Sequence, residues 1–99
     1  MPYRIEYSPE VENHLCSLTT RLQAIVLDTI EKKLTYQPTI ETKNRKPLRP
    51  NLLALWELRI GNLRVYYDVE EEPEPIVRIR AVGMKLRNQV LIGKEVVKL

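Results

Sequence analysis

Two arginines, Arg59 and Arg64, stand on either side of the dipeptide Gly61-Asn62. A Gly-Asn pair between two alternating segments is typical of a two-residue β-hairpin loop. With these two residues in the loop, Arg59 lies directly opposite Arg64. Like charges that face each other destabilise a hairpin unless an anion bridges them, and guanidinium groups bind phosphate oxygens in pairs. The spacing therefore indicates a phosphate-binding site.

The hairpin that carries these arginines covers residues 53–69 and separates an apolar face from a polar one. Its predicted cross-strand pairs are Ile60 with Leu63, Arg59 with Arg64, Leu58 with Val65, Glu57 with Tyr66 and Trp56 with Tyr67. The predicted core face consists of Ala54, Trp56, Leu58, Ile60, Leu63, Val65, Tyr67 and Val69. The opposite face carries Leu55, Glu57, Arg59, Arg64, Tyr66 and Asp68.

A further strand is predicted over residues 76–82, after a proline-containing turn that cannot continue a ladder. Pairing Val69 with Val77 places Val77, Ile79 and Ala81 in the core. The same register puts Asp68 opposite Arg78, Tyr66 opposite Arg80 and Arg64 opposite Val82. Asp68 is then a candidate partner for Arg78, and Glu57 or Tyr66 for Arg59. Four arginines share the face that the helices leave open: Arg59, Arg64, Arg78 and Arg80.

The remaining segments complete a small α+β domain. Residues 3–7 alternate and predict a first strand, and Ser8-Pro9-Glu10 is typical of a helix start. Apolar residues at helical spacing predict one helix that ends near residues 17–19 and a second from a Thr20 cap to about Tyr36. Residues 89–99 predict a short extra strand or hairpin. We expect the order β-α-α-β-β-β, an antiparallel sheet and a helical hairpin on one face.

Length and composition favour one small domain over residues 1–99, with 43% hydrophobic residues. A lone Cys16 excludes an internal disulfide framework and a cysteine-built metal site, and it fits a reducing cytosol. Apolar runs stay well short of a membrane span, and the first residues lack a signal-peptide pattern. We expect a cytoplasmic protein without a membrane anchor, a metal or a small-molecule cofactor.

The net charge of +3 conceals a strong segregation along the chain. Residues 41–66 hold six cations against two carboxylates, and residues 78–99 hold six against Glu95 alone. Such clustering indicates a surface for a polyanion, although a charged run is also compatible with a solvated face. Residues 39–50 lack a period of their own and predict a loop, either a solubilising connector or an RNA-binding segment. The loop cations are Lys43, Arg45, Lys46 and Arg49.

The predicted element order, the hairpin and the closing run Ala81-Val82-Gly83-Met84-Lys85 together resemble the RelE/ParE superfamily of bacterial toxin-antitoxin toxins. The most specific part is the pattern Leu-Arg-x-Gly-x-x-Arg-Val-x-Tyr, and residues 46–52 resemble the loop of the YoeB-type branch. The resemblance implies a curved antiparallel sheet and ribosome-dependent mRNA cleavage that inhibits translation. It implies a cognate antitoxin, the ribosome and mRNA as partners.

The resemblance also assigns roles to single residues. The phosphate-clamping arginine falls on Arg64, the arginine before the hairpin glycine on Arg59, and the basic loop residue on Arg49. The cation after the closing Val-Gly falls on Lys85, with Arg87 two residues further on. Departures from the family pattern are Leu55 and Glu57 in place of two lysines, Lys46 in place of the YoeB-type glutamate, Leu91 near the position of a terminal tyrosine, and the lack of a C-terminal His-Tyr pair.

The missing groups are the usual acid and base, and RNA cleavage by the ribose 2′-hydroxyl needs both together with cations at phosphorus. Glu57, or Lys46 with a depressed pKa, is the remaining candidate base. His14 lies on the first predicted helix, away from the arginine face. The candidate catalytic residues are Arg64, Arg59, Arg80, Lys85 and Glu57; the candidate RNA-binding residues are Lys43, Arg45, Lys46, Arg49, Arg78 and Arg87. A ParE-like toxin that poisons DNA gyrase, or a degenerate antitoxin-binding member, remains the alternative.

Overall fold

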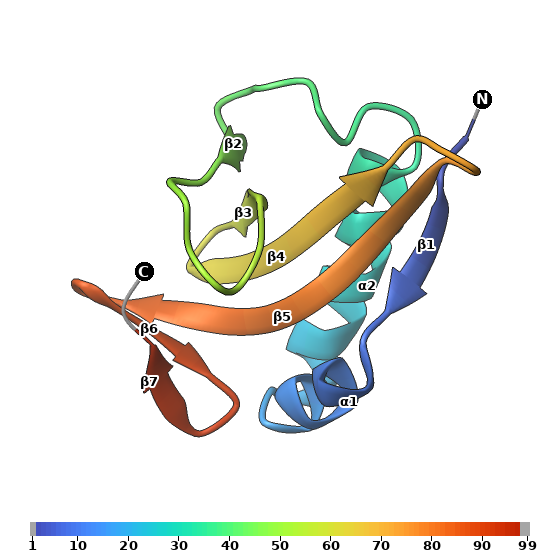
Figure 1. Cartoon of the computed structure of the whole chain (residues 1–99). Helices are drawn as coiled ribbons and strands as arrows, with labels where there is room; N and C mark the ends of the chain where they lie inside the picture. Colours follow the sequence, from blue (N-terminus) through green and yellow to red (C-terminus); the bar gives the residue numbers. More distant parts are fainter. Residues whose placement is uncertain (1, 98–99) are drawn as a thin grey trace.

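Two helices lie together on one face of a curved β-sheet (Figure 1). The structure, a computed structural model, describes residues 2–97. Its α+β class and its order of strand, helix, helix and antiparallel strands agree with the prediction. The elements are β1 (Arg4–Tyr7), α1 (Pro9–Cys16), α2 (Thr20–Leu34), β2 (Arg45–Pro47), β3 (Trp56–Ile60), β4 (Leu63–Glu70), β5 (Ile76–Leu86), β6 (Gln89–Ile92) and β7 (Glu95–Val97).

Both helices begin where polar residues precede them. Helix α1 starts at Pro9, directly after Ser8, as predicted. Thr19 rather than Thr20 is the N-cap of α2, since its hydroxyl accepts a hydrogen bond from the backbone N–H of Leu22 at 3.2 Å. The buried stripe of α2 faces the sheet and consists of Val26, Ile30 and Leu34.

The central hairpin has the predicted register. Arg59 pairs with Arg64 and Glu57 pairs with Tyr66, and Gly61 adopts a φ of +58° in the connecting turn. This conformation is readily available to glycine, which explains why the turn falls at this residue. The strand order is β2-β3-β4-β5-β6-β7, and β1 pairs in parallel with β5. Figure 1 shows β5 as the long, bent strand against which the others are arranged.

The pairing of β4 with β5 is only partly as predicted. Asp68 lies opposite Arg78, but the register shifts between Tyr66 and Tyr67. Arg80 is the extra residue of this bulge, so that Tyr66 lies opposite Ala81 instead of Arg80. The predicted pairing of Arg64 with Val82 is likewise wrong, because the shift places Gly83 opposite Arg64. Side chains alternate between the two faces of the sheet on both sides of the bulge. The sequence pattern therefore does not show that the register shifts between them.

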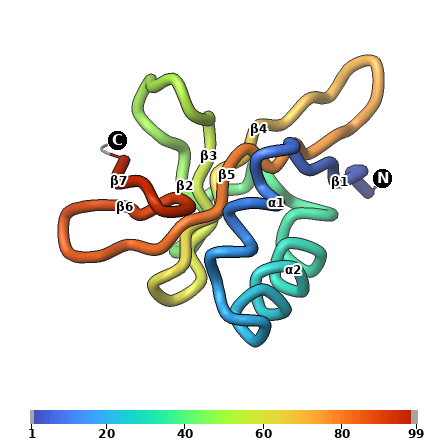
Figure 2. The backbone as a smooth tube through the Cα atoms, turned by 90° about the horizontal axis from the view of Figure 1, so that it is seen from below, coloured from blue at the N-terminus to red at the C-terminus, as the bar shows by residue number. Residues whose placement is uncertain are grey.

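The bulge divides the buried residues between two faces of the sheet. On the helical face, Val82, Ile79 and Tyr67 belong to the main core with the stripe of α2. On the other face, Tyr66 and Ala81 pack with Ala54 and Ile92, so Ala81 is buried on the face opposite to the one predicted. Figure 2 shows the helices on one side of the sheet and the β6–β7 hairpin on the other. This second cluster forms the floor beneath the candidate site.

Strand β2 replaces part of the predicted loop. Arg45 is only 9% exposed, and it donates from Nη1 to the carbonyl of Lys33 at 2.7 Å and from Nε to the carbonyl of Ile40 at 3.1 Å. These bonds hold the segment beside β3, where Arg45 lies opposite Leu58. The sequence alone does not show whether such an arginine is buried and bonded to the backbone or exposed to solvent.

The predicted C-terminal hairpin is present as β6 and β7, with Gly93 at a φ of +63° in the turn. Residues 98 and 99, which the prediction included, lie outside the described part of the chain. Neither described helix is long and apolar enough to cross a membrane.

Candidate functional site

A pocket of about 370 Å³ opens between the β3–β4 hairpin, the 47–51 segment and the β5–β6 hairpin. Its volume lies within the range of small-ligand sites, roughly 300–1,000 Å³. Four cations and one carboxylate line it: Arg49, Arg59, Arg64, Lys85 and Glu57. Strand pairing brings these residues together from distant parts of the sequence, since Lys85 follows Gly83 and Gly83 pairs with Arg64. The pocket is therefore suited to an anionic ligand.

Arg64 lies in the wall of this pocket and is not on an open surface as predicted. It is only 8% exposed. Its Nη1 donates to the carbonyls of Gly61 at 2.7 Å and Leu63 at 2.9 Å. These bonds fix the guanidinium against the glycine turn. A fixed guanidinium loses less conformational freedom on binding a phosphate than a mobile one does.

Glu57 is the buried carboxylate of the site, with 11% of its side chain exposed. Its Oε1 accepts a hydrogen bond from Arg59 Nε at 2.7 Å and lies 3.7 Å from Arg64 Nε. The two arginines that face each other across the hairpin thus share one internal anion. This ion pair offsets their mutual repulsion without any ligand. Arg59 keeps 44% of its side chain exposed and also lines the pocket.

Tyr66 also lines the pocket, and it is fully buried. Its hydroxyl has no hydrogen-bond partner among residues 2–97. Burial raises the pKa of Tyr66 most, and the neighbouring Glu57 carboxylate, which the phenol approaches without full hydrogen-bond geometry, raises it further. The charges of Arg64 and Arg59 oppose this effect, and the phenol stays protonated. Within residues 2–97, the tyrosine is therefore a hydrogen-bond donor without a complete hydrogen bond.

Lys85 and Arg49 add to the exposed positive charge that Arg59 brings to the site. The backbone N–H of Lys85 donates to the carbonyl of Asn62 at 2.7 Å, which ties the end of β5 to the glycine turn. Beyond Lys85, Arg87 lies at the β5–β6 turn with a φ of +58° and lines a neighbouring shallow depression. The cations at the end of β5 and in the β5–β6 turn thus adjoin those of the central hairpin.

A solved structure of known biological context has a similar fold. A chain of the crystal structure of the toxin-antitoxin complex RelBE2 from Mycobacterium tuberculosis superposes with a TM-score of 0.73 and 26% sequence identity, over 86% of this chain and all of that one. The chain has a RelE-like fold. The sequence itself matches no family model and no curated protein. The resemblance to the RelE/ParE superfamily is confirmed by structure.

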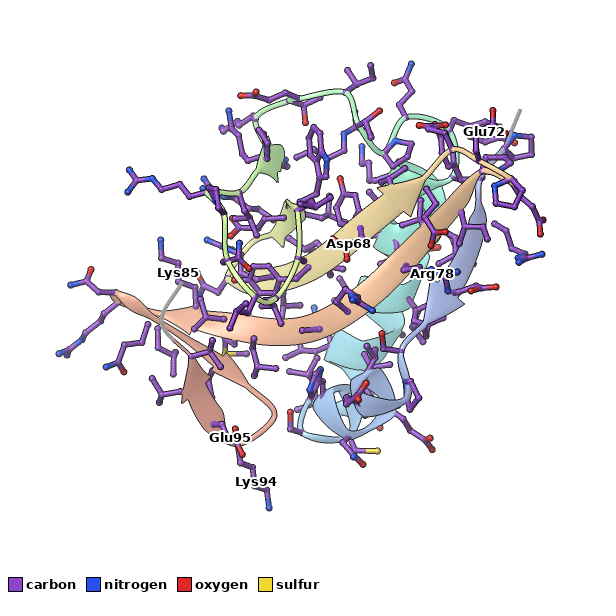
Figure 3. All side chains as sticks on the ribbon, viewed as in Figure 1. Asp68, Glu72, Arg78, Lys85, Lys94 and Glu95 are labelled. Carbon is purple, nitrogen blue, oxygen red and sulfur yellow. The ribbon has the colours of Figure 1, made fainter. Side chains whose placement is uncertain are left out.

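Not all the candidate residues of this RelE-like chain belong to the pocket. Arg80 makes an ion pair with Asp68 at 3.1 Å, and Arg78 pairs with Glu6 at 2.6 Å and with Glu70. The predicted register of Asp68 opposite Arg78 is confirmed, but the predicted ion pair between them is wrong, because the carboxylate pairs with Arg80 of the bulge. Figure 3 shows Lys85 and Arg78 toward opposite ends of β5. The predicted four-arginine surface is divided between the two ends of the sheet.

The loop cations are also divided. Arg45 is an internal anchor, and its hydrogen bonds to backbone carbonyls leave it away from the pocket, contrary to its predicted exposed position. Lys46 pairs with Glu41 at 3.3 Å, whereas Lys43 is exposed. Only Arg49 of this group lines the pocket.

Tyr66 is the pocket residue whose chemistry the candidate list missed. It was placed on the polar face, but only as a partner for Arg59. Its pairing with Glu57 was already visible in the predicted register, and a tyrosine beside a carboxylate on the arginine-bearing face was the available signal.

Proposed function

We propose that this RelE-like chain is the toxin of a type II toxin-antitoxin system and inhibits translation by ribosome-dependent cleavage of mRNA in the cytoplasm. The observation that carries the proposal is the set of four cations around one buried carboxylate, on a fold shared with a chain of a toxin-antitoxin complex. A pocket of this charge favours an RNA phosphate.

The pocket contains groups for most of the chemistry of RNA cleavage. In that reaction the ribose 2′-oxygen forms a bond to phosphorus while the bond from phosphorus to the 5′-oxygen breaks. Glu57 accepts the proton of the 2′-hydroxyl, and Arg64, Arg59 and Lys85 stabilise the charge that develops on the phosphate oxygens. The 5′-oxygen takes its proton from water or from the ribosomal site, because the family's terminal tyrosine is replaced near Leu91.

The proposed partner in the resting cell is a cognate antitoxin. The similar structure is a toxin-antitoxin complex. An acidic segment of such a partner neutralises the pocket cations and keeps RNA away. Co-purification of this chain with the product of an adjacent gene tests this part of the proposal, and persistent failure to associate contradicts it.

Induction of the chain without an antitoxin tests the activity. Pulse labelling is expected to show a rapid loss of protein synthesis while DNA synthesis continues at first. Arg64→Ala is expected to abolish the arrest, whereas Arg21→Ala, which removes the same charge from the exposed surface of α2, is expected to keep it. Full arrest by a stably folded Arg64→Ala variant contradicts the assignment of the pocket.

A ParE-like action on DNA gyrase is the second candidate function. It is favoured by Glu57, which occupies the position of a lysine in RelE-type members and is tied to Arg59 at 2.7 Å. This function predicts that DNA synthesis stops before protein synthesis in the same labelling experiment. A degenerate member that only binds an antitoxin predicts no arrest of either.

A further inference from the structure

The hydroxyl of Tyr66 is the starting point, because it is buried without a partner among the described residues. An unsatisfied buried hydroxyl costs stability in the free protein. The next residue, Tyr67, shows the usual arrangement, in which the hydroxyl donates to the carbonyl of Pro38 at 2.6 Å. Tyr66 lines the cationic pocket, whereas Tyr67 packs in the main core on the helical face. An unused donor at the pocket is an indication of a ligand group.

Glu57 supplies the complementary group. It is the cross-strand partner of Tyr66 and lines the same pocket. A protonated phenol donates a hydrogen bond, and an ionised carboxylate accepts one. A ligand group that lies between them must accept from Tyr66 and donate to Glu57. A phosphate oxygen does not meet this requirement, because it cannot donate and the carboxylate repels it. A hydroxyl group does.

The surrounding cations identify the kind of hydroxyl. Arg59 and Arg64 both lie beside Glu57, so a hydroxyl at the Glu57–Tyr66 pair has a phosphate-binding group directly next to it. A ribonucleotide within a chain has this arrangement, since its 2′-hydroxyl is both donor and acceptor and is adjacent to the 3′-phosphate. DNA has the phosphate without the hydroxyl.

We propose that Glu57 and Tyr66 together recognise the ribose 2′-hydroxyl and make this pocket selective for RNA over DNA. The proposal rests on the proposed function for its substrate class and adds Tyr66 as a specificity-determining residue. When the ribonucleotide binds, Glu57 exchanges its hydrogen bond with Arg59 for one with the 2′-hydroxyl. The exposed side chain of Arg59 turns from the carboxylate to the ligand phosphate, and the 2′-hydroxyl takes its place at Oε1. Arg64 stays fixed by the carbonyls of the turn.

The test uses two mononucleotides that have no scissile internucleotide bond, so that cleavage cannot affect the measurement. Adenosine 3′-monophosphate and 2′-deoxyadenosine 3′-monophosphate are titrated into the full chain, and binding is followed by NMR chemical shifts. The ribonucleotide is expected to bind about tenfold more tightly, as is typical for one or two additional hydrogen bonds.

Tyr66→Phe is expected to weaken binding of the ribonucleotide several-fold and to leave that of the deoxynucleotide unchanged. Glu57→Gln is expected to reduce the same preference, because the amide presents a donor as well as an acceptor. Tyr36→Phe removes a hydroxyl from a side chain that is 69% exposed and is expected to retain the full preference. Thermal stability supplies a second readout: Tyr66→Phe is expected to be at least as stable as the unmodified chain.

Three results overturn the proposal: equal or undetectable binding of the two nucleotides by the unmodified chain, equal weakening of both by Tyr66→Phe, or a loss of stability in Tyr66→Phe, which would assign an internal partner to the hydroxyl. Translation arrest is measured separately. A ribose preference without arrest retains this inference and rejects the proposed function, and arrest without a ribose preference does the reverse.

Discussion

Tyr66 and Tyr67 are adjacent in β4 and equally buried, yet their side chains lie on opposite faces of the sheet, and only the hydroxyl of Tyr67 is hydrogen-bonded. Tyr67 donates to Pro38, while Tyr66 has no partner within residues 2–97. The alternation of side chains along a strand separates them, one toward the helices and one toward the cationic pocket. One tyrosine therefore stabilises the fold, and the other is available to a ligand.

The first prediction concerns Tyr67. Replacement by phenylalanine is expected to lower the free energy of unfolding by about 1–2 kcal/mol, because the buried carbonyl of Pro38 loses its donor. Chemical denaturation of Tyr67→Phe and Tyr66→Phe side by side measures the difference. Equal losses of stability would show that the two hydroxyls are bonded alike.

The second prediction concerns the stability of Arg64→Ala. Removal of one of two facing like charges relieves repulsion with Arg59, but the guanidinium also bonds to the carbonyls of Gly61 and Leu63. Their loss is expected to outweigh the relief of repulsion with Arg59 and to cost about 1 kcal/mol. Thermal denaturation measures it, with Arg21→Ala as the exposed control. A cost several times larger would mean that loss of arrest in this variant reflects unfolding.

The hairpin and its arginines were predictable because local chemistry determines them. A Gly-Asn turn and strict alternation fix the pairing of Arg59 with Arg64 without any contact beyond the hairpin. The bulge at Arg80 was not predictable, since it depends on how β5 must bend between β4 on one side and both β1 and β6 on the other. The helices were placed correctly apart from their last residues.

The division of the cations has the same kind of cause. Side-chain type showed where positive charge lies in the sequence, but not which charge has an internal partner. Arg45, Arg78 and Arg80 are bound by groups that become neighbours only in the folded chain. Arg49, Arg64 and Lys85 line one pocket.

The third prediction concerns Gly83, which brings β6 close to β5. A Cβ atom at this position would lie 2.6 Å from the carbonyl oxygen of Leu91 and 2.8 Å from Cγ1 of Ile92. Gly83→Ala is therefore expected to separate the two strands and to cost about 2–3 kcal/mol. Nucleotide binding is expected to fall as well, because Lys85 follows in the same strand.

Gly61→Ala is the matched control for this substitution. A Cβ at Gly61 would meet nothing within 4 Å, so its cost comes only from the φ of +58° and is expected to be about 1 kcal/mol. Chemical denaturation of the two variants compares a steric cost with a conformational one. A smaller cost at Gly83 than at Gly61 would contradict the close approach of the strands.

The fourth prediction is a pH dependence of stability from His14. Its Nδ1 accepts a hydrogen bond from the backbone N–H of Val82 at 3.3 Å, on the stretch of β5 between β1 and β6. Partial burial lowers its pKa below the usual 6.5, and the charge of Glu10 opposes this effect. Arg80 lines the same depression.

Because the unfolded chain binds this proton more readily, the contribution of His14 is fully present above pH 6.5 and is lost as the pH falls from there through the lower pKa of the folded state. Denaturation is measured across this range for the unmodified chain and for His14→Gln. The two proteins have the same carboxyl groups, so the effect of these groups cancels in the comparison. The difference in their free energies of unfolding is expected to grow with pH. A constant difference would mean that His14 has the same pKa in both states.

The fifth prediction separates the two cations of β5 that were candidates for catalysis. Lys85 is exposed and lines the pocket, whereas Arg80 is paired with Asp68 at 3.1 Å outside it. Lys85→Ala is expected to weaken binding of adenosine 3′-monophosphate about tenfold, with little change in stability, because the phosphate loses one of the charged contacts of the pocket. Arg80→Ala is expected to bind within about twofold of the unmodified chain and to lose at most about 1 kcal/mol, the usual limit for an exposed ion pair. Asp68 keeps a second partner in the backbone N–H of Leu55, at 2.8 Å, which limits that loss.

Both substitutions remove one positive charge, so their long-range electrostatic effects on the nucleotide are matched. Titration of the nucleotide therefore distinguishes a direct contact with the phosphate from a general effect of charge. If Arg80→Ala weakened binding as much as Lys85→Ala, the anion would have to lie further along β5, toward the bulge, and the pocket at the glycine turn would not be its site.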